Sequence, residues 1–164
     1  MDTRAVVEHH LDALQRADLE ATLDDYTDES LLLVDTSVAV ALTVADHEHH
    51  EATIMAISER RLGLCGHAAF ETFSVLTRLP TPARRSPATV ARLLAEGFPE
   101  TRFIGAEAAA SLLAALGSAV IAGGAVYDAL VGACAAEHGL ELATRDRRAL
   151  ETYRALDVRV EMLT

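Results

Sequence analysis

The sequence contains no lysine, so its 14 basic residues are all arginines. Against these stand 25 acidic residues, which gives a formal net charge of -11. A protein of this charge repels polyanions at long range, so any binding of nucleic acid must depend on local arginine clusters or on bound cations. Broad electrostatic attraction to nucleic acid is therefore excluded.

Long apolar runs and cysteine motifs are also lacking. No stretch of about 18 uninterrupted apolar residues occurs, and the N-terminus opens with charged residues where a signal peptide would have a basic start and an apolar run. We therefore expect a cytoplasmic protein with no membrane contact. Cys65 and Cys134 are the only cysteines and show no CxxC spacing, so two buried thiols are expected in place of a disulfide or a zinc site.

The charge changes in character near Ser30. Residues 1–30 hold nine acidic residues and two arginines, a net charge of -7, and show helical spacing of apolar residues. The remaining 134 residues of the 164 carry 16 acidic residues and 12 arginines, enough chain for one compact domain. We predict an acidic helical extension over 1–30 and a single domain over 31–164.

Within 31–164, helical and strand patterns alternate. The apolar run Leu31–Val34 predicts a strand that is buried on both faces. Further strands are expected over about 62–65, 101–104, 140–144 and 158–163, and helices over about 37–45, 48–60, 67–78, 87–94, 106–116, 125–138 and 146–156. This alternation predicts an α/β fold, a three-layer α/β/α sandwich around a mainly parallel sheet, whose ligands lie beyond the carboxyl ends of the strands.

Two acidic residues follow strands of this sheet. Asp35 comes directly after the first strand, and Asp146 directly after the strand over 140–144. In a parallel sheet both emerge at the same edge. An aspartate after a strand can also cap the next helix, which is the alternative interpretation of Asp35.

Two more acidic residues occupy apolar helices. Glu71 is flanked by Phe70 and Phe73, and Asp128 opens a helix that is otherwise nearly uncharged until Glu137. Such carboxylates are costly unless they are paired, hydrogen-bonded or bound to a cation, although an aspartate in a first turn also favours the helix dipole. Together the four acids predict an oxygen-rich pocket suited to Mg²⁺ or Mn²⁺.

Four segments carry a family resemblance: LLLVDTSVAVAL, FETFSVLTRLP, GGAVYDALVGACAAEHGLELATRD and VRVEML. In order and spacing they resemble PIN-domain ribonucleases of the VapC toxin type, over nearly all of 31–164. The resemblance implies hydrolysis of RNA phosphodiester bonds by one or two metal ions. It places the catalytic and metal-binding residues at Asp35, Glu71, Asp128 and Asp146, with Thr36, Ser37 and Thr144 as supporting hydroxyls.

The resemblance also implies partners. We expect an RNA substrate, a VapB-type antitoxin and a homodimer, for which the apolar helices over 37–45 and 48–60 offer a face. Candidate phosphate contacts are the arginines beside the fourth acid, Arg145, Arg147 and Arg148, and those of the proline-containing turn, Arg78, Arg84 and Arg85. Ordinary solvated surface charge is the alternative for each.

Three other interpretations remain open. A PIN-like fold can serve as a non-catalytic interaction module. The segment VVEHHLDALQRADLEATLDDYTDES resembles the opening helices of SnoaL-like domains. The extension, with His9 and His10, therefore leaves open that the protein is an enzyme acting on a small molecule. The cluster of His47, His49 and His50 leaves open a transition-metal site, or cleavage of RNA without a metal by histidine acid–base chemistry.

Overall fold

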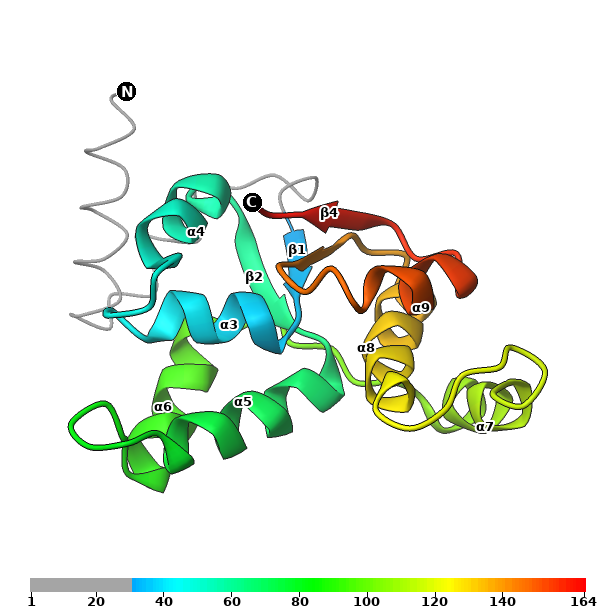
Figure 1. The fold of residues 1–164 in the computed structure, drawn as a ribbon, viewed down its shortest axis with the longest axis horizontal. Coiled ribbons are helices and arrows are strands. Elements are labelled where there is room, and N and C mark those ends of the chain that lie inside the picture. The colour runs from blue at the N-terminus through cyan, green and yellow to red at the C-terminus, as the bar shows by residue number, and fades with distance from the viewer. Residues whose placement is uncertain (1–30) are drawn as a thin grey trace.

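The computed structural model describes residues 31–164. The expected helical extension, the SnoaL-like segment and the two histidines within it lie outside the described residues. The described chain builds a parallel sheet in the order β2-β1-β3-β4 (Figure 1). Its strands are β1 (Leu31–Val34), β2 (Arg61–Leu64), β3 (Leu142–Thr144) and β4 (Val160–Met162).

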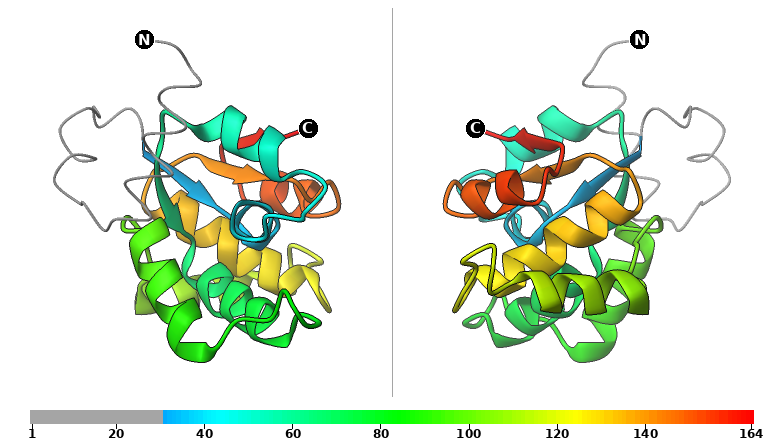
Figure 2. Two further views of the ribbon diagram at one scale, coloured as in Figure 1. Left: turned by 90° about the vertical axis from the view of Figure 1, so that its left-hand side faces the viewer. Right: turned by 90° about the vertical axis from the view of Figure 1, so that its right-hand side faces the viewer.

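Helices cover both sides of this sheet (Figure 2). They are α3 (Thr36–Thr43), α4 (His50–Ile57), α5 (Gly66–Arg78), α6 (Pro87–Gly97), α7 (Ala106–Ala115), α8 (Ala125–Glu137) and α9 (Leu150–Ala155). Helix α5 packs against α3, α6 and α8, while α7 packs against α8 at one end of the molecule. The predicted α/β sandwich around a parallel sheet is confirmed. No helix of residues 31–164 is long and apolar enough to cross a membrane.

Strand β1 lies at the centre of the fold because its side chains are apolar on both faces. Leu32, Leu33 and Val34 are fully buried, and the strand pairs with β2 on one side and β3 on the other. Continuous apolar sequence is what a parallel strand needs when helices cover both of its faces. The carboxyl ends of β1 and β3 therefore meet at one edge, as the sequence predicts.

Local signals set the ends of several helices. Ser86 caps α6 by accepting a hydrogen bond from the amide of Thr89 at 3.1 Å, and Pro87 takes the first position of that helix. Gly139 follows α8 with a φ of +65°, a backbone conformation that glycine adopts at little cost. Both predicted boundaries are confirmed.

Two predicted elements are wrong in extent. Residues 101–104 form no strand, since Arg102 makes only an isolated bridge with Cys65 before the chain turns into α7. The amides of Glu100 and Arg102 bind the carbonyls of Leu62 and Leu64 at 3.2 and 3.0 Å, so the segment lines the edge of β2 without extending further. Helix α9 starts at residue 150 instead of 146, because a turn separates it from β3.

The cysteines behave as expected. Cys65 and Cys134 are both buried and carry free thiols. The two side chains lie close enough to share a hydrogen bond, which raises the pKa of Cys65 and lowers that of Cys134 to about 7. Cys65 directly follows β2 and Cys134 lies in α8, and neither side chain hydrogen-bonds to one of the four predicted acids in the structure of residues 31–164.

Candidate active site

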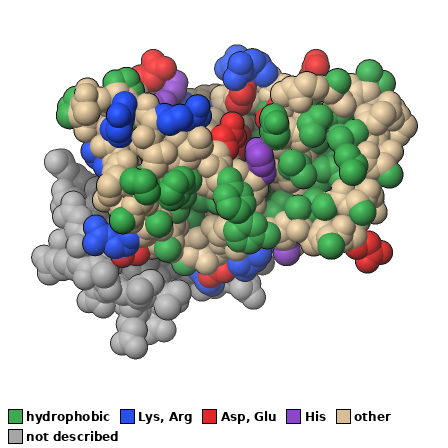
Figure 3. Space-filling view, turned by 90° about the horizontal axis from the view of Figure 1, so that it is seen from below, with side chains coloured by type: hydrophobic (Ala, Val, Ile, Leu, Met, Phe, Trp, Pro, Cys, Tyr) green, Lys and Arg blue, Asp and Glu red, His purple; other side chains and the backbone are tan. Residues whose placement is uncertain are grey.

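The acidic side chains gather on one face of the molecule. Seen from below, they lie along a hollow with hydrophobic side chains on either side (Figure 3). The hollow is at the edge where β1 and β3 end and where α5 and α8 come together. Each of the four predicted acids belongs to one of these elements or follows it directly.

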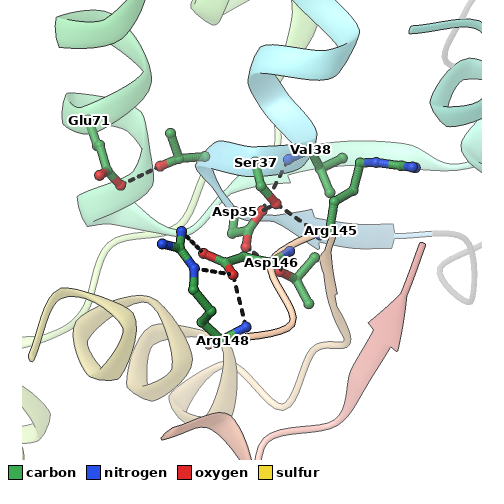
Figure 4. A network of polar contacts seen from close by, with 9 residues as sticks. Asp35, Ser37, Val38, Glu71, Arg145, Asp146 and Arg148 are labelled. Carbon is green, nitrogen blue, oxygen red and sulfur yellow. Dashed lines mark hydrogen bonds and ion pairs between the residues drawn. The ribbon is translucent and has the colours of Figure 1, made fainter. Parts of the chain in front are cut away.

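Asp35 connects the two strands. One of its carboxylate oxygens, Oδ1, accepts hydrogen bonds from the amide of Val38 at 3.1 Å and from the Ser37 hydroxyl at 2.5 Å (Figure 4). The other, Oδ2, accepts from the Thr144 hydroxyl at 2.5 Å. The side chain is only 5% exposed, and this burial raises its pKa although every one of these hydrogen bonds favours the ionised form. Asp35 is thus both the cap of α3 and a buried acid held across the sheet.

The predicted hydroxyl residues divide between two acids. Ser37 accepts a hydrogen bond from the amide of Arg145 at 2.8 Å, and Thr144 accepts from the amide of Asp146 at 3.0 Å. These two hydroxyls therefore fix the loop after β3 against Asp35. Thr36 instead donates to Glu71 Oε2 at 2.6 Å, which orients the acid of α5 (Figure 4).

The two helical acids differ in their surroundings. Glu71 lies on an exposed part of α5, so the apolar burial that its neighbours suggest is wrong. Asp128 lies partly buried in the first turn of α8. Its pKa is raised by burial and then by the negative charges of Asp146, Asp35 and Glu71. The charges of the other three acids therefore all act on Asp128, so the four predicted acids lie around one place at this edge of the sheet.

Arg148 is the cation of this pocket. It binds Asp146 through its backbone amide at 2.9 Å, through Nε at 3.0 Å and through Nη2 at 2.7 Å (Figure 4). These contacts lower the pKa of Asp146, and the arginine side chain remains 91% exposed. The pairing was not predicted. The spacing Asp-x-Arg in the turn after β3 is the signal that could have indicated it.

The other arginines beside the fourth acid lie differently. Arg145 points away from Asp146 (Figure 4), and its Nη1 donates to the Thr53 hydroxyl at 3.3 Å. Arg147 is exposed. In the turn between α5 and α6, the exposed arginines bind nearby backbone carbonyls: Arg78 that of Ser74, Arg84 that of Leu79 and Arg85 that of Pro82.

The clustered histidines do not enter the pocket. His47 and His49 lie in the turn that follows the C-terminal end of α3, and His50 begins α4, whereas Asp35 caps the opposite end of α3. His50 Nδ1 lies 2.8 Å from the carbonyl oxygen of Ala41. This placement leaves the four carboxylates, and not the histidines, as the chemical centre.

The pocket suits a hard divalent cation by its chemistry. Among residues 31–164, no three acidic, histidine or cysteine side chains already stand as close together as the ligands of a metal ion. The donors are nevertheless carboxylates, which Mg²⁺ and Mn²⁺ prefer. Burial and then the charges of the other three acids raise the pKa of Asp128, and a divalent cation would offset those charges. The residues present therefore fit such an ion.

This fold and this pocket define a known class of protein. The PIN domain family matches residues 32–155, and the chain belongs to it. Among its relatives, Ribonuclease VapC27 of Mycobacterium tuberculosis is 49% identical over 79% of this chain and 94% of the relative. Ribonuclease VapC40 of the same species is 44% identical over 82% of this chain and 100% of the relative. VapBC2 from Rickettsia felis, solved bound to a promoter DNA fragment, shares the fold with a TM-score of 0.59 and 12% identity, covering 82% of this chain and 99% of that one.

Proposed function

We propose that this protein is a ribonuclease toxin of a toxin-antitoxin system and that it hydrolyses RNA phosphodiester bonds with Mg²⁺ or Mn²⁺ held by Asp35, Glu71, Asp128 and Asp146. The relatives named as VapC ribonucleases support the activity. The observation that carries the mechanism is the convergence of the acids at one edge of the sheet. Asp35 and Asp146 follow the paired strands β1 and β3 and are linked through the Thr144 hydroxyl, and the charges of the other three acids act on Asp128. Such a bound cation activates water for in-line attack and stabilises charge on the leaving oxygen.

The chain's own residues prepare the pocket. Ser37 and Thr144 hold the two oxygens of Asp35 in fixed directions, and Thr36 does the same for Glu71. Arg148 keeps Asp146 ionised. We expect the exposed Arg147 to contact phosphate, whereas Arg148 would first have to release Asp146 and Arg145 would have to leave Thr53.

The test is cleavage of single-stranded RNA by purified protein. We expect cleavage with Mg²⁺ or Mn²⁺, none with EDTA, and losses of orders of magnitude in Asp35→Asn and Asp128→Asn, which keep the side-chain shape but remove the charge. The matched control is Asp157→Asn, because Asp157 is exposed at a φ of +54° that asparagine also tolerates. Near-normal cleavage by folded Asp35→Asn would contradict the mechanism, whereas no cleavage by the folded unmodified protein with Mg²⁺ or Mn²⁺ would favour the non-catalytic interaction module.

We also propose that a VapB-type antitoxin covers the pocket and that the protein forms a homodimer. The negative charge of the pocket would attract a basic side chain of the antitoxin, and the exposed Met55 of α4 would extend an apolar face between two copies. Co-expression with the gene next to this one should yield a stable complex without RNA cleavage. Light scattering that gives only a monomer, with no co-purifying partner, would contradict both proposals.

A further inference from the structure

Aromatic side chains are distributed unevenly in this protein. Phe98 and Tyr153 are buried in the core, as aromatic residues usually are. Phe70, Phe103 and Tyr127 instead expose 68, 56 and 55% of their surface. The whole chain contains only four phenylalanines and three tyrosines, so these three exposed rings are a large share of its aromatic residues.

These exposed rings form two pairs that connect neighbouring elements. His67 of α5 and Tyr127 of α8 stack with centroids 4.9 Å apart and planes 9° apart. Phe70 of α5 and Phe103, which precedes α7, meet at 6.1 Å with planes tilted by 58°. We call the four side chains the aromatic platform. In the first pair, one face of Tyr127 is covered by His67, and its exposure shows that another part of the ring meets solvent.

The aromatic platform adjoins the acidic pocket. Tyr127 directly precedes Asp128, and Phe70 directly precedes Glu71. His67 lies four residues before Glu71, so these two side chains share one side of α5. Figure 3 shows hydrophobic side chains beside acidic ones on this face of the molecule. Because His67 shares its side of α5 with Glu71 and stacks on Tyr127, a ligand held by Glu71 would lie beside this pair of rings.

One glycine allows Phe103 to take its place in the platform. A Cβ atom on Gly66 would lie 2.9 Å from Phe103 Cδ1 and 3.2 Å from its Cα. A side chain at the start of α5 would thus push the ring away. The glycine at position 66 therefore permits the close approach of Phe103 to α5.

We propose that the aromatic platform stacks against unpaired bases of an RNA strand whose phosphate lies at the acidic pocket, an inference that rests on the proposed ribonuclease function. Every nucleobase offers a flat π-face, so aromatic side chains bind single strands by stacking with little dependence on sequence. A base adjoining the reacting phosphate would meet Tyr127 or Phe70.

The negative charge of the protein makes stacking important for binding RNA. The protein has a net charge of -11, and two of the three arginines after β3 are engaged with Asp146 and Thr53. Phosphate contacts alone would therefore have to overcome repulsion from the carboxylates. Stacking is independent of charge and can hold the strand where electrostatic attraction is weak.

The experiment compares the rings with an aliphatic control. The variants are Tyr127→Leu and Phe70→Leu, which remove a ring and keep an apolar side chain, and Tyr127→Phe, which keeps the ring. The control is Leu113→Ala, which removes a 73% exposed apolar side chain on α7. The probe is a short single-stranded RNA of mixed sequence carrying one 2-aminopurine, whose fluorescence falls on stacking, recorded by stopped flow with Mg²⁺ before cleavage.

We expect quenching with the unmodified protein and with Tyr127→Phe and Leu113→Ala. Quenching should be lost in Tyr127→Leu, together with about a 5- to 150-fold weaker binding of the probe. Phe70→Leu should weaken binding within the same range. An RNA with an abasic site at the 2-aminopurine position should bind the unmodified protein and Tyr127→Leu equally.

The outcomes separate this inference from the proposed function. Quenching that depends on Tyr127 without any RNA cleavage would uphold the platform and overturn the ribonuclease. Cleavage and binding that are unchanged in both leucine variants would overturn the platform and leave the ribonuclease intact. If those variants instead lose only a co-purifying protein partner, the surface is a protein interface and the stacking proposal is wrong. Absence of both quenching and cleavage would overturn both.

Discussion

Asp35 shows why one residue can satisfy two interpretations. The sequence allowed it to be a helix cap or a functional acid, and the structure shows the cap through Oδ1 and a buried contact across the sheet through Oδ2. Oδ1 accepts from the amide of Val38 in α3, whereas Oδ2 reaches Thr144 at the end of β3. Capping alone would not bury the acid across two strands, and burial is what raises its pKa.

That raised pKa predicts how stability depends on pH. Since the folded protein binds the proton of Asp35 more tightly than the unfolded chain does, Asp35 lowers the free energy of unfolding as the pH rises from its ordinary pKa through its raised one. Asp35→Asn carries no such group. Without divalent cations, thermal melts should show the variant gaining stability relative to the unmodified protein as the pH rises above about 4, the ordinary pKa of an aspartate. A difference that stays constant with pH would contradict this account.

The contact of Arg148 with Asp146 predicts an effect on the affinity for a metal ion. Its bidentate contact with Asp146 must be broken, or shared, before that acid can bind a cation. Because the pair is exposed and such pairs are weak, Arg148→Ala should tighten Mn²⁺ binding only about two- to fivefold. Isothermal titration calorimetry measures this. The control is Arg147→Ala, which removes the same charge from the neighbouring exposed position; an equal gain there would mean that net charge, not the contact, is responsible.

At the scale of elements, the sequence predicted those structures whose signals are local. The apolar run of β1 and the Ser86–Pro87 start of α6 both follow from neighbouring residues, and both are found. The expected strand over 101–104 depended on what it would pair with. Only Arg102 forms a bridge, because the chain turns into α7 at Gly105. Pairing partners are set by tertiary packing, which no local pattern contains.

Gly63 allows the segment that contains Glu100 to pack closely against the edge of β2. A Cβ atom there would lie 2.1 Å from the carbonyl oxygen of Glu100, a backbone atom that cannot move alone. Gly63→Ala should therefore displace the chain from the edge of β2 and cost about 2 kcal/mol or more of the free energy of unfolding. Urea denaturation measures this. The control is Gly97→Ala, where a Cβ meets nothing within 4 Å; equal losses in both would show that the contact does not matter.

At the scale of the molecule, the sequence could identify the four acids, but it could not predict how they are arranged relative to one another. Asp35 and Asp146 follow paired parallel strands, so their common edge could be expected from the sequence. The place of Asp128 beside them depends on the packing of α5 against α8 and of α8 against α9. The contact of Glu71 with Thr36 depends instead on the packing of α5 against α3. Sequence spacing does not contain those orientations.

The domain boundary at Ser30 remains a prediction. Residues 31–164 contain a sheet, a buried core and all four acids. A fragment that begins at Leu31 should therefore unfold cooperatively and keep the cleavage activity of the full chain. Circular dichroism melts and RNA cleavage measure the two properties. Loss of the cooperative transition would show that residues 1–30 contribute to the fold.

The last prediction couples the pocket to the stability of the whole domain. A cation that binds only the folded protein adds about 1.4 kcal/mol to the free energy of unfolding when its free concentration is ten times its Kd, which corresponds to roughly 3–5 °C in Tm. Mn²⁺ should therefore raise the Tm of the unmodified protein and of Asp157→Asn, but hardly that of Asp128→Asn.

The same shift should depend on pH. The pKa of Asp128 is raised by burial and then by its three acidic neighbours, so as the pH falls a cation must displace a proton from the pocket before it binds. The gain in Tm at a fixed Mn²⁺ concentration should therefore shrink from pH 8 to pH 5, and scanning calorimetry measures it. A gain that is the same at both pH values, or that survives in Asp128→Asn, would place the cation elsewhere on the protein.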